Sequence, residues 1–199
     1  MDSCRTAGEQ AARWRAAGIP DGYTISRLLY TAAAEVIIAE LRAMNDGYLP
    51  QRLVMRPTSS DKYEPIGNPG PDVSFESAAT CEKEPILAFN SKTWQRNPEG
   101  RLSGANWDGL YVFNVRTREL NFRVSGENFI KPEPYDERAW ISEILSLSDD
   151  ANHAYVKVAL GKRLEDGEKQ SVRYDYYLAW LDLKTRGLKL ISQLKNLWF

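Results

Sequence analysis

The sequence LYVFNVRTREL at residues 110–120 returns as LAWLDLKTRGL at residues 178–188. When Asn114 is aligned with Asp182, the two Thr-Arg dipeptides coincide. Each copy consists of an alternating strand, a polar turn around Thr-Arg and a second alternating strand, which is the pattern of a β-hairpin. Because an internal repeat constrains architecture more than any single residue does, the repeat predicts a chain built from antiparallel hairpins.

Further strands extend this pattern on both sides of the repeat. Residues 85–89 form a short apolar run typical of a buried strand, and residues 109–125 form the first hairpin. A second unit is predicted to hold four strands, with a polar turn at residues 148–152 between the first two. These four strands are expected at residues 140–147, 154–160, 174–183 and 188–194.

The second unit resembles a blade of the Tol-type or WD-like β-propeller families. The resemblance is carried by SLSDDANHAYVKVAL at residues 146–160 and YYLAWLDLKTRGLKLIS at residues 176–192. In those repeats a Ser-x-Asp turn precedes an Ala-Tyr strand, and a Leu/Tyr-x-x-Asp-Leu-x-Thr-Gly-x-Leu hairpin closes the blade. The first unit, PILAFNSKTW to LYVFNVRTRELNFRVS, lacks that turn and has Glu119 where Gly187 stands in the second.

The resemblance implies four-stranded antiparallel blades over residues 85–194. A closed propeller needs at least four blades, and the sequence provides two such units. The units could therefore close a propeller across subunits, or they could form an open sheet covered by helices. We favour the open sheet, because the N-terminal part of the chain has an apolar helical pattern that needs a surface to cover.

The first fifty residues predict two helices. Thr6 and Glu9 have the spacing of a capping box, and good helix formers follow until Gly18 and Pro20. A second helix is expected from Ile25 to Met44, since its apolar residues cover a broad stripe. The predicted fold class is therefore α+β, with two N-terminal helices followed by antiparallel β meanders.

Three segments follow from this pattern. Residues 1–48 are expected to be helical, and the Pro-rich residues 49–71 are expected to connect them to a β region at residues 72–199. The two blade-like units would occupy about residues 72–126 and 138–194 of that β region.

Composition excludes several classes of function. The 199 residues carry 26 basic and 27 acidic side chains, and this near-neutral balance argues against a nucleic-acid partner. No apolar stretch is long enough for a membrane-spanning helix. Two cysteines, Cys4 and Cys81, suggest a reducing compartment, and we expect a cytoplasmic protein. With one histidine and no nucleotide or metal motif, we expect neither a metal site nor a cofactor.

The segment Ser91–Asp108 is the best candidate for a binding site. It is expected to be an 18-residue loop between two strands, and long loops within a compact domain are often functional. Tryptophan and arginine are enriched at interface hot spots, and they also suit sugar or anion pockets. The alternative is that the two tryptophans of this segment belong to the core. The predicted ligand or partner contacts are Trp94, Arg96, Arg101, Trp107 and, from the second unit, Trp140.

We therefore expect a non-enzymatic binding or protein-interaction module whose partner is a protein or a small molecule. The alternative is a small hydrolase-like or lyase-like enzyme that uses carboxylates and His153. We also expect a homodimer, because exposed strand edges and the apolar residues at 194–199 need to be covered.

Overall fold

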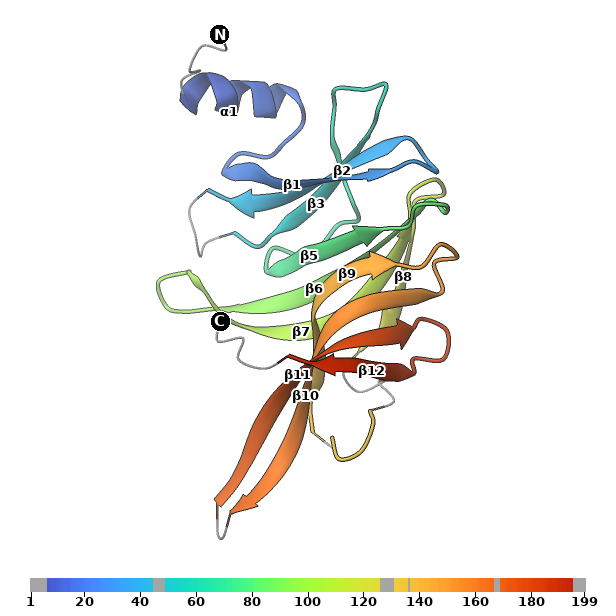
Figure 1. Cartoon of the computed structure of the whole chain (residues 1–199). Helices are drawn as coiled ribbons and strands as arrows, with labels where there is room; N and C mark the ends of the chain where they lie inside the picture. The colour runs from blue at the N-terminus through green and yellow to red at the C-terminus, as the bar shows by residue number, and fades with distance from the viewer. Residues whose placement is uncertain (1–6, 45–48, 126–130, 136, 167–168, 195–199) are drawn as a thin grey trace.

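A computed structural model describes residues 7–44, 49–125, 131–135, 137–166 and 169–194 (Figure 1). This part of the chain forms one short helix and three four-stranded antiparallel sheets. The first sheet contains β1 (Tyr23–Thr31), β2 (Val36–Ala43), β3 (Arg52–Pro57) and β4 (Glu64–Pro65). The second contains β5 (Val73–Thr80), β6 (Ile86–Arg96), β7 (Leu102–Asn114) and β8 (Glu119–Val124). The third contains β9 (Ala139–Leu147), β10 (His153–Asp166), β11 (Lys169–Asp182) and β12 (Leu188–Gln193).

The predicted α+β class is wrong, because the protein is nearly all β. Only the first of the two expected helices is present, as α1 (Ala7–Ala16). It ends at Gly18, which has φ +84°. The amide N–H of Gly18 donates to Arg15 O and that of Ile19 donates to Trp14 O, the two bonds of a Schellman C-cap. The expected capping residue Thr6 lies outside the described residues.

The expected helix at residues 25–44 is instead the β1–β2 hairpin, with Glu35 in the left-handed region at φ 51°. Its broad apolar stripe has a simple cause. β2 is covered on both faces, so that Ile38 packs toward the second sheet while Leu41 packs beneath α1. A strand buried on both faces loses the alternation that identifies it, and its apolar run then imitates a helix.

The predicted antiparallel strands after residue 72 are confirmed, and the repeat has the same turn in both copies. The Asn114 side-chain oxygen accepts hydrogen bonds from the N–H groups of Arg116 and Thr117. Asp182 accepts the equivalent pair, from Lys184 and Thr185. The three sheets are compatible with blade-like units, but the described residues form no closed sheet. The domain boundaries stay predictions, and residues 49–71 contribute β3 and β4.

The sheets are stacked (Figure 1). Buried apolar side chains form one layer between each neighbouring pair of sheets. The layer between the first and second sheets includes Ile38, Leu53, Phe75, Leu87 and Phe89. The layer between the second and third sheets includes Leu110, Val124, Ile141, Ile144, Val156, Leu160 and Leu181. A third cluster joins α1 to the outer face of the first sheet through Trp14, Ile19, Tyr23, Leu41 and Val54. The order is therefore α1, first sheet, second sheet, third sheet.

Two hairpins project beyond this stack (Figure 1). β6 and β7 remain paired as far as Arg96 and Leu102, so residues 91–108 form a long hairpin and not the expected loop. β10 and β11 pair continuously from His153 and Asp182 to Asp166 and Lys169. The base of each hairpin contributes side chains to the candidate site.

Candidate functional site

A hollow of about 320 Å³ lies where the second and third sheets meet, and we call it the Trp107–Trp140 hollow. The second sheet supplies three side chains to its lining, and the third sheet with the segment just before it supplies the other three. The lining residues are Lys92, Ala105 and Trp107 on one side, and Arg138, Trp140 and Tyr174 on the other.

Strand register fixes the side of the hollow formed by the second sheet. Lys92 in β6 is the cross-strand neighbour of Trp107 in β7, so both side chains lie on the same face of the sheet. The Trp107 indole N–H donates to Asn90 Oδ1 at 3.4 Å. Asn90 is fully buried, and its amide donates to the carbonyl oxygen of Ile141 in β9 at 3.1 Å. Through this bridge the tryptophan is held at the junction of the two sheets.

Two small residues in β10 shape the opposite side. Trp140 in β9 stands opposite Ala159, and Tyr174 in β11 stands opposite Gly161. Because neither β10 side chain rises between them, the rings of Trp140 and Tyr174 meet across the strand, with centroids 4.8 Å apart at 62°. This edge-to-face contact places two aromatic rings side by side in the hollow.

Two cations complete the lining. Lys92 Nζ lies 2.5 Å from Glu76 Oε1, and both side chains are largely buried. The Arg138 side chain is exposed and donates from Nη2 to Asn106 Oδ1 at 3.1 Å. With the described residues Arg138 forms no ion pair, so its guanidinium keeps donors for an incoming anion. The hollow thus combines aromatic surface with positive charge.

The structure brings together two of the five predicted site residues, Trp107 and Trp140. The other three lie farther along the β6–β7 hairpin, toward its turn, and do not line the hollow. Trp94 donates from its indole nitrogen to Ser74 Oγ at 2.9 Å, and Arg96 pairs with Asp72 at 2.6 Å. Arg101 is exposed beside the hairpin turn. As ligand contacts, Trp94, Arg96 and Arg101 stay predictions.

Sequence reasoning missed Lys92, Arg138 and Tyr174. Lys92 lies inside the segment proposed as the site, and Tyr174 begins a predicted strand. The sequence therefore indicated both segments, but not that these two side chains belong to the site. The alternation of Tyr174 and Tyr176 could have placed both rings on one strand face. No local signal marks Arg138, because its role depends on how two sheets far apart in the sequence meet.

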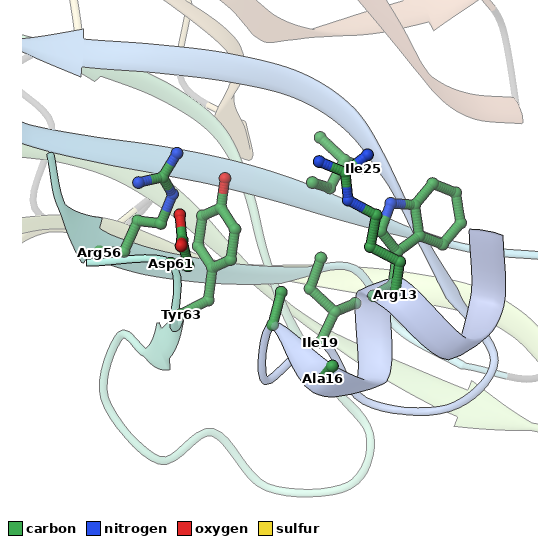
Figure 2. Close-up of a pocket in the computed structure, with 9 residues that line it drawn as sticks. Arg13, Ala16, Ile19, Ile25, Arg56, Asp61 and Tyr63 are labelled. Carbon is green, nitrogen blue, oxygen red and sulfur yellow. The ribbon is translucent and has the colours of Figure 1, made fainter. Parts of the chain in front are cut away.

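A second hollow, of about 420 Å³, lies between α1 and the outer face of the first sheet (Figure 2). Its lining includes Arg13, Trp14, Ile19, Arg56 and Tyr63. The Arg56 guanidinium lies over the Tyr63 ring, 5.3 Å from its centroid, and donates to Ser60 O at 2.5 Å. Three of these residues also hold the helix on the sheet, since Trp14, Ile19 and Tyr63 belong to one apolar cluster. We therefore attribute this hollow mainly to helix docking.

His153 lies outside both hollows. Its ring is tilted against that of Trp180, with centroids 5.2 Å apart. Its Nδ1 lies 4.0 Å from Asp150 Oδ1, and its Nε2 lies 3.8 Å from Asp182 Oδ2. Hydrogen bonds from Asn152 and Ser148 hold the pKa of Asp150 well below its usual range. Backbone hydrogen bonds from Thr185 and Lys184 lower the pKa of Asp182. Each carboxylate thus accepts hydrogen bonds within its own turn, Asp150 between β9 and β10 and Asp182 between β11 and β12.

Comparison with known proteins adds no relative to this geometry. No protein-family model matches the chain, and no curated protein matches its sequence at a significant level. Across the described ranges, no three His, Cys, Asp or Glu side chains are grouped so that they could hold a metal ion. In the same part of the chain, no helix is both long enough and apolar enough to span a membrane.

Proposed function

We propose that the protein is a non-enzymatic binding module that holds a small anionic ligand with a planar or sugar ring in the Trp107–Trp140 hollow. One observation carries the proposal. Trp107 and Trp140 were selected from the sequence for their chemistry, and in the fold they line one hollow together with Lys92 and Arg138. The volume, about 320 Å³, is at the lower end of the range of small-molecule sites.

The chemistry of the ligand follows from the lining. A ring can stack against Trp140 or Tyr174 and displace water from apolar surface. A carboxylate, sulfate or phosphate on the same molecule can accept hydrogen bonds from Arg138, whose planar fork suits such anions. Lys92 adds positive charge, although Glu76 already neutralises part of it. Arg138 is therefore expected to contribute more to anion selectivity than Lys92.

Ligand-observed NMR with two matched probes tests this proposal. Benzoate carries a ring and an anion, and benzyl alcohol carries the same ring without charge. We expect saturation transfer to benzoate in the parent protein, with about tenfold weaker binding in Arg138→Ala and in Trp140→Leu. Arg27→Ala, which removes an exposed arginine from β1, is the control and should bind benzoate as the parent does.

Two results would contradict the proposed site. One is equal binding of benzoate and benzyl alcohol, which would mean that charge plays no part. The other is unchanged benzoate binding in Arg138→Ala when its melting temperature matches that of the parent.

The enzymatic alternative with His153 stays a prediction, as do the cytoplasmic location and the absence of a nucleic-acid partner.

A further inference from the structure

We propose that the outer face of the third sheet is a homodimer interface, on which the same face of a second copy packs. The outer face is the face of the third sheet opposite to the one from which Ile141, Val156 and Leu181 enter the core. Register places Trp140, Tyr155, Tyr176, Leu178 and Trp180 on it. This inference does not rest on the proposed ligand, although Trp140 and Tyr174 belong both to this face and to the Trp107–Trp140 hollow at its edge. It gives the homodimer expected from the sequence a specific surface.

Among the described residues, a helix covers only the end of the stack formed by the first sheet (Figure 1). At the first end α1 covers the first sheet through Trp14 and Ile19. At the other end, the described residues place no helix or sheet over the third sheet. Stacked repeats require a polar outer face on a terminal unit that stays in water. The third sheet instead carries aromatic rings on this face, with charged side chains among them.

Aromatic side chains dominate this face. Tyr155 and Trp180 are cross-strand neighbours whose ring centroids lie 4.1 Å apart at 85°. Trp140 lies 6.4 Å from Tyr176 and 4.8 Å from Tyr174. Tyr155 is 40% exposed and Tyr174 is 37% exposed. Tyrosine and tryptophan are enriched at protein interfaces, where their rings provide apolar area and their polar tips find partners.

The charges of the face are balanced, which favours a second copy as the occupant. Lys157 and Glu143 form an ion pair between the two groups of rings. Lys189 lies beside Trp180 at one edge, and Asp182 lies opposite His153 at one end. These two positive and two negative groups leave the centre of the face without net charge, and Arg138 adds one positive charge at the edge beside Trp140, so two identical faces repel each other little. A strongly acidic or basic partner would find no complementary charge here.

The area of the face approaches the size of a standard dimer interface. Strands are about 4.8 Å apart and rise about 3.3 Å per residue, so four strands of about six residues cover roughly 400 Å². The β10–β11 projection adds about 200 Å² by the same spacing. Projecting side chains raise the accessible area further, toward the 800 Å² per partner of a standard interface.

Light scattering after size exclusion, over a range of micromolar concentrations, tests the proposal. The parent should have about twice the chain mass of 22.6 kDa. Tyr155→Lys combined with Trp180→Lys should give a monomer, because the changes put two positive charges on each face. These residues do not line the Trp107–Trp140 hollow, so a ligand failure and a dimer failure remain distinguishable.

The matched control is Leu28→Lys combined with Tyr30→Lys in β1. These two side chains are 57% and 54% exposed, at the other end of the stack, and this variant should stay dimeric. If the Tyr155 and Trp180 variant fails to fold, Lys157→Glu provides a second test, since it sets a like charge beside Glu143 and should weaken association at least tenfold. If the parent protein is monomeric, the proposal is wrong, even if a different protein is later found to bind this face. A folded, dimeric face variant overturns it as well.

Discussion

Gly161→Ala should lower the free energy of unfolding and weaken ligand binding at the candidate site. A Cβ at this position would lie 2.8 Å from Arg138 O, 2.9 Å from Glu137 Cβ and 2.9 Å from Tyr174 Cε1. Carbon atoms at optimal separation are about 3.5–4.0 Å apart. The backbone cannot easily retreat, because Gly161 N–H donates to Arg138 O at 3.0 Å and Gly161 O accepts from Glu137 N–H at 3.1 Å.

The expected cost follows from these contacts. Overpacking of this kind destabilises by about 1–3 kcal/mol. Replacing glycine by alanine returns about 0.4–1 kcal/mol by restricting the unfolded chain. The net loss at Gly161 is therefore about 1–2 kcal/mol, which for about 200 residues lowers the melting temperature by about 2–8 °C. Displacement of Tyr174 and Arg138 should also weaken benzoate binding.

Differential scanning calorimetry of two variants checks this reasoning. Gly70→Ala is the control, because a Cβ at Gly70 would meet only Val73 Cγ2, at an ordinary 3.7 Å. The control should melt at or slightly above the parent temperature and bind benzoate normally. If Gly161→Ala melts like Gly70→Ala and keeps the near-ultraviolet circular dichroism of the parent, the crowding that we describe around Gly161 does not exist.

Two further predictions concern the core and the repeated turn. Leu41→Ala should lower the free energy of unfolding by about 2–5 kcal/mol because Leu41 is fully buried, whereas Leu28→Ala, at an exposed site of the same hairpin, should change it by less than about 0.5 kcal/mol in urea titrations. Asp182→Asn should melt near the parent temperature at pH 7, since Asn114 performs the same capping in the other copy, while Asp182→Ala should melt lower. The lowered pKa of Asp182 stabilises the fold above about pH 4, and that contribution disappears as the pH falls through the folded-state pKa. Asp182→Asn should therefore lose less stability between pH 5 and pH 2, and an identical acid profile for the two proteins would show that Asp182 does not contribute.

The sequence was informative wherever the structure is local. Hairpins joined by short turns keep strict alternation and turn residues such as Asn114 and Asp182, so the strands after residue 72 could be predicted. The β1–β2 hairpin could not, because burial on both faces of β2 removes the alternation. For the same reason the first sheet was not predicted at all. The sequence indicated two blade-like units, whereas the structure has three sheets.

The candidate site shows the same limit. Trp107 was selected because residues 91–108 were expected to form a long loop rich in tryptophan and arginine, and Trp140 was added from the second unit. The segment is a hairpin, but both tryptophans line the hollow. Their meeting with Arg138 depends on the Asn90 amide that bridges β6 to the edge of β9. No periodicity in a single sequence reports which strands of different sheets pack against each other, so this half of the site could be found only from the fold.

Alkylation of Cys81 can report when the second sheet separates from the turn between β9 and β10. Cys81 is fully buried, and its Sγ lies 3.2 Å from Ser148 O and 3.3 Å from Asp149 O in the turn between β9 and β10. A thiol reagent can therefore reach it only after the second sheet has parted from that turn. In a Cys4→Ser background, the alkylation rate of Cys81 under native conditions would measure the opening of this one junction, without any dye or engineered label.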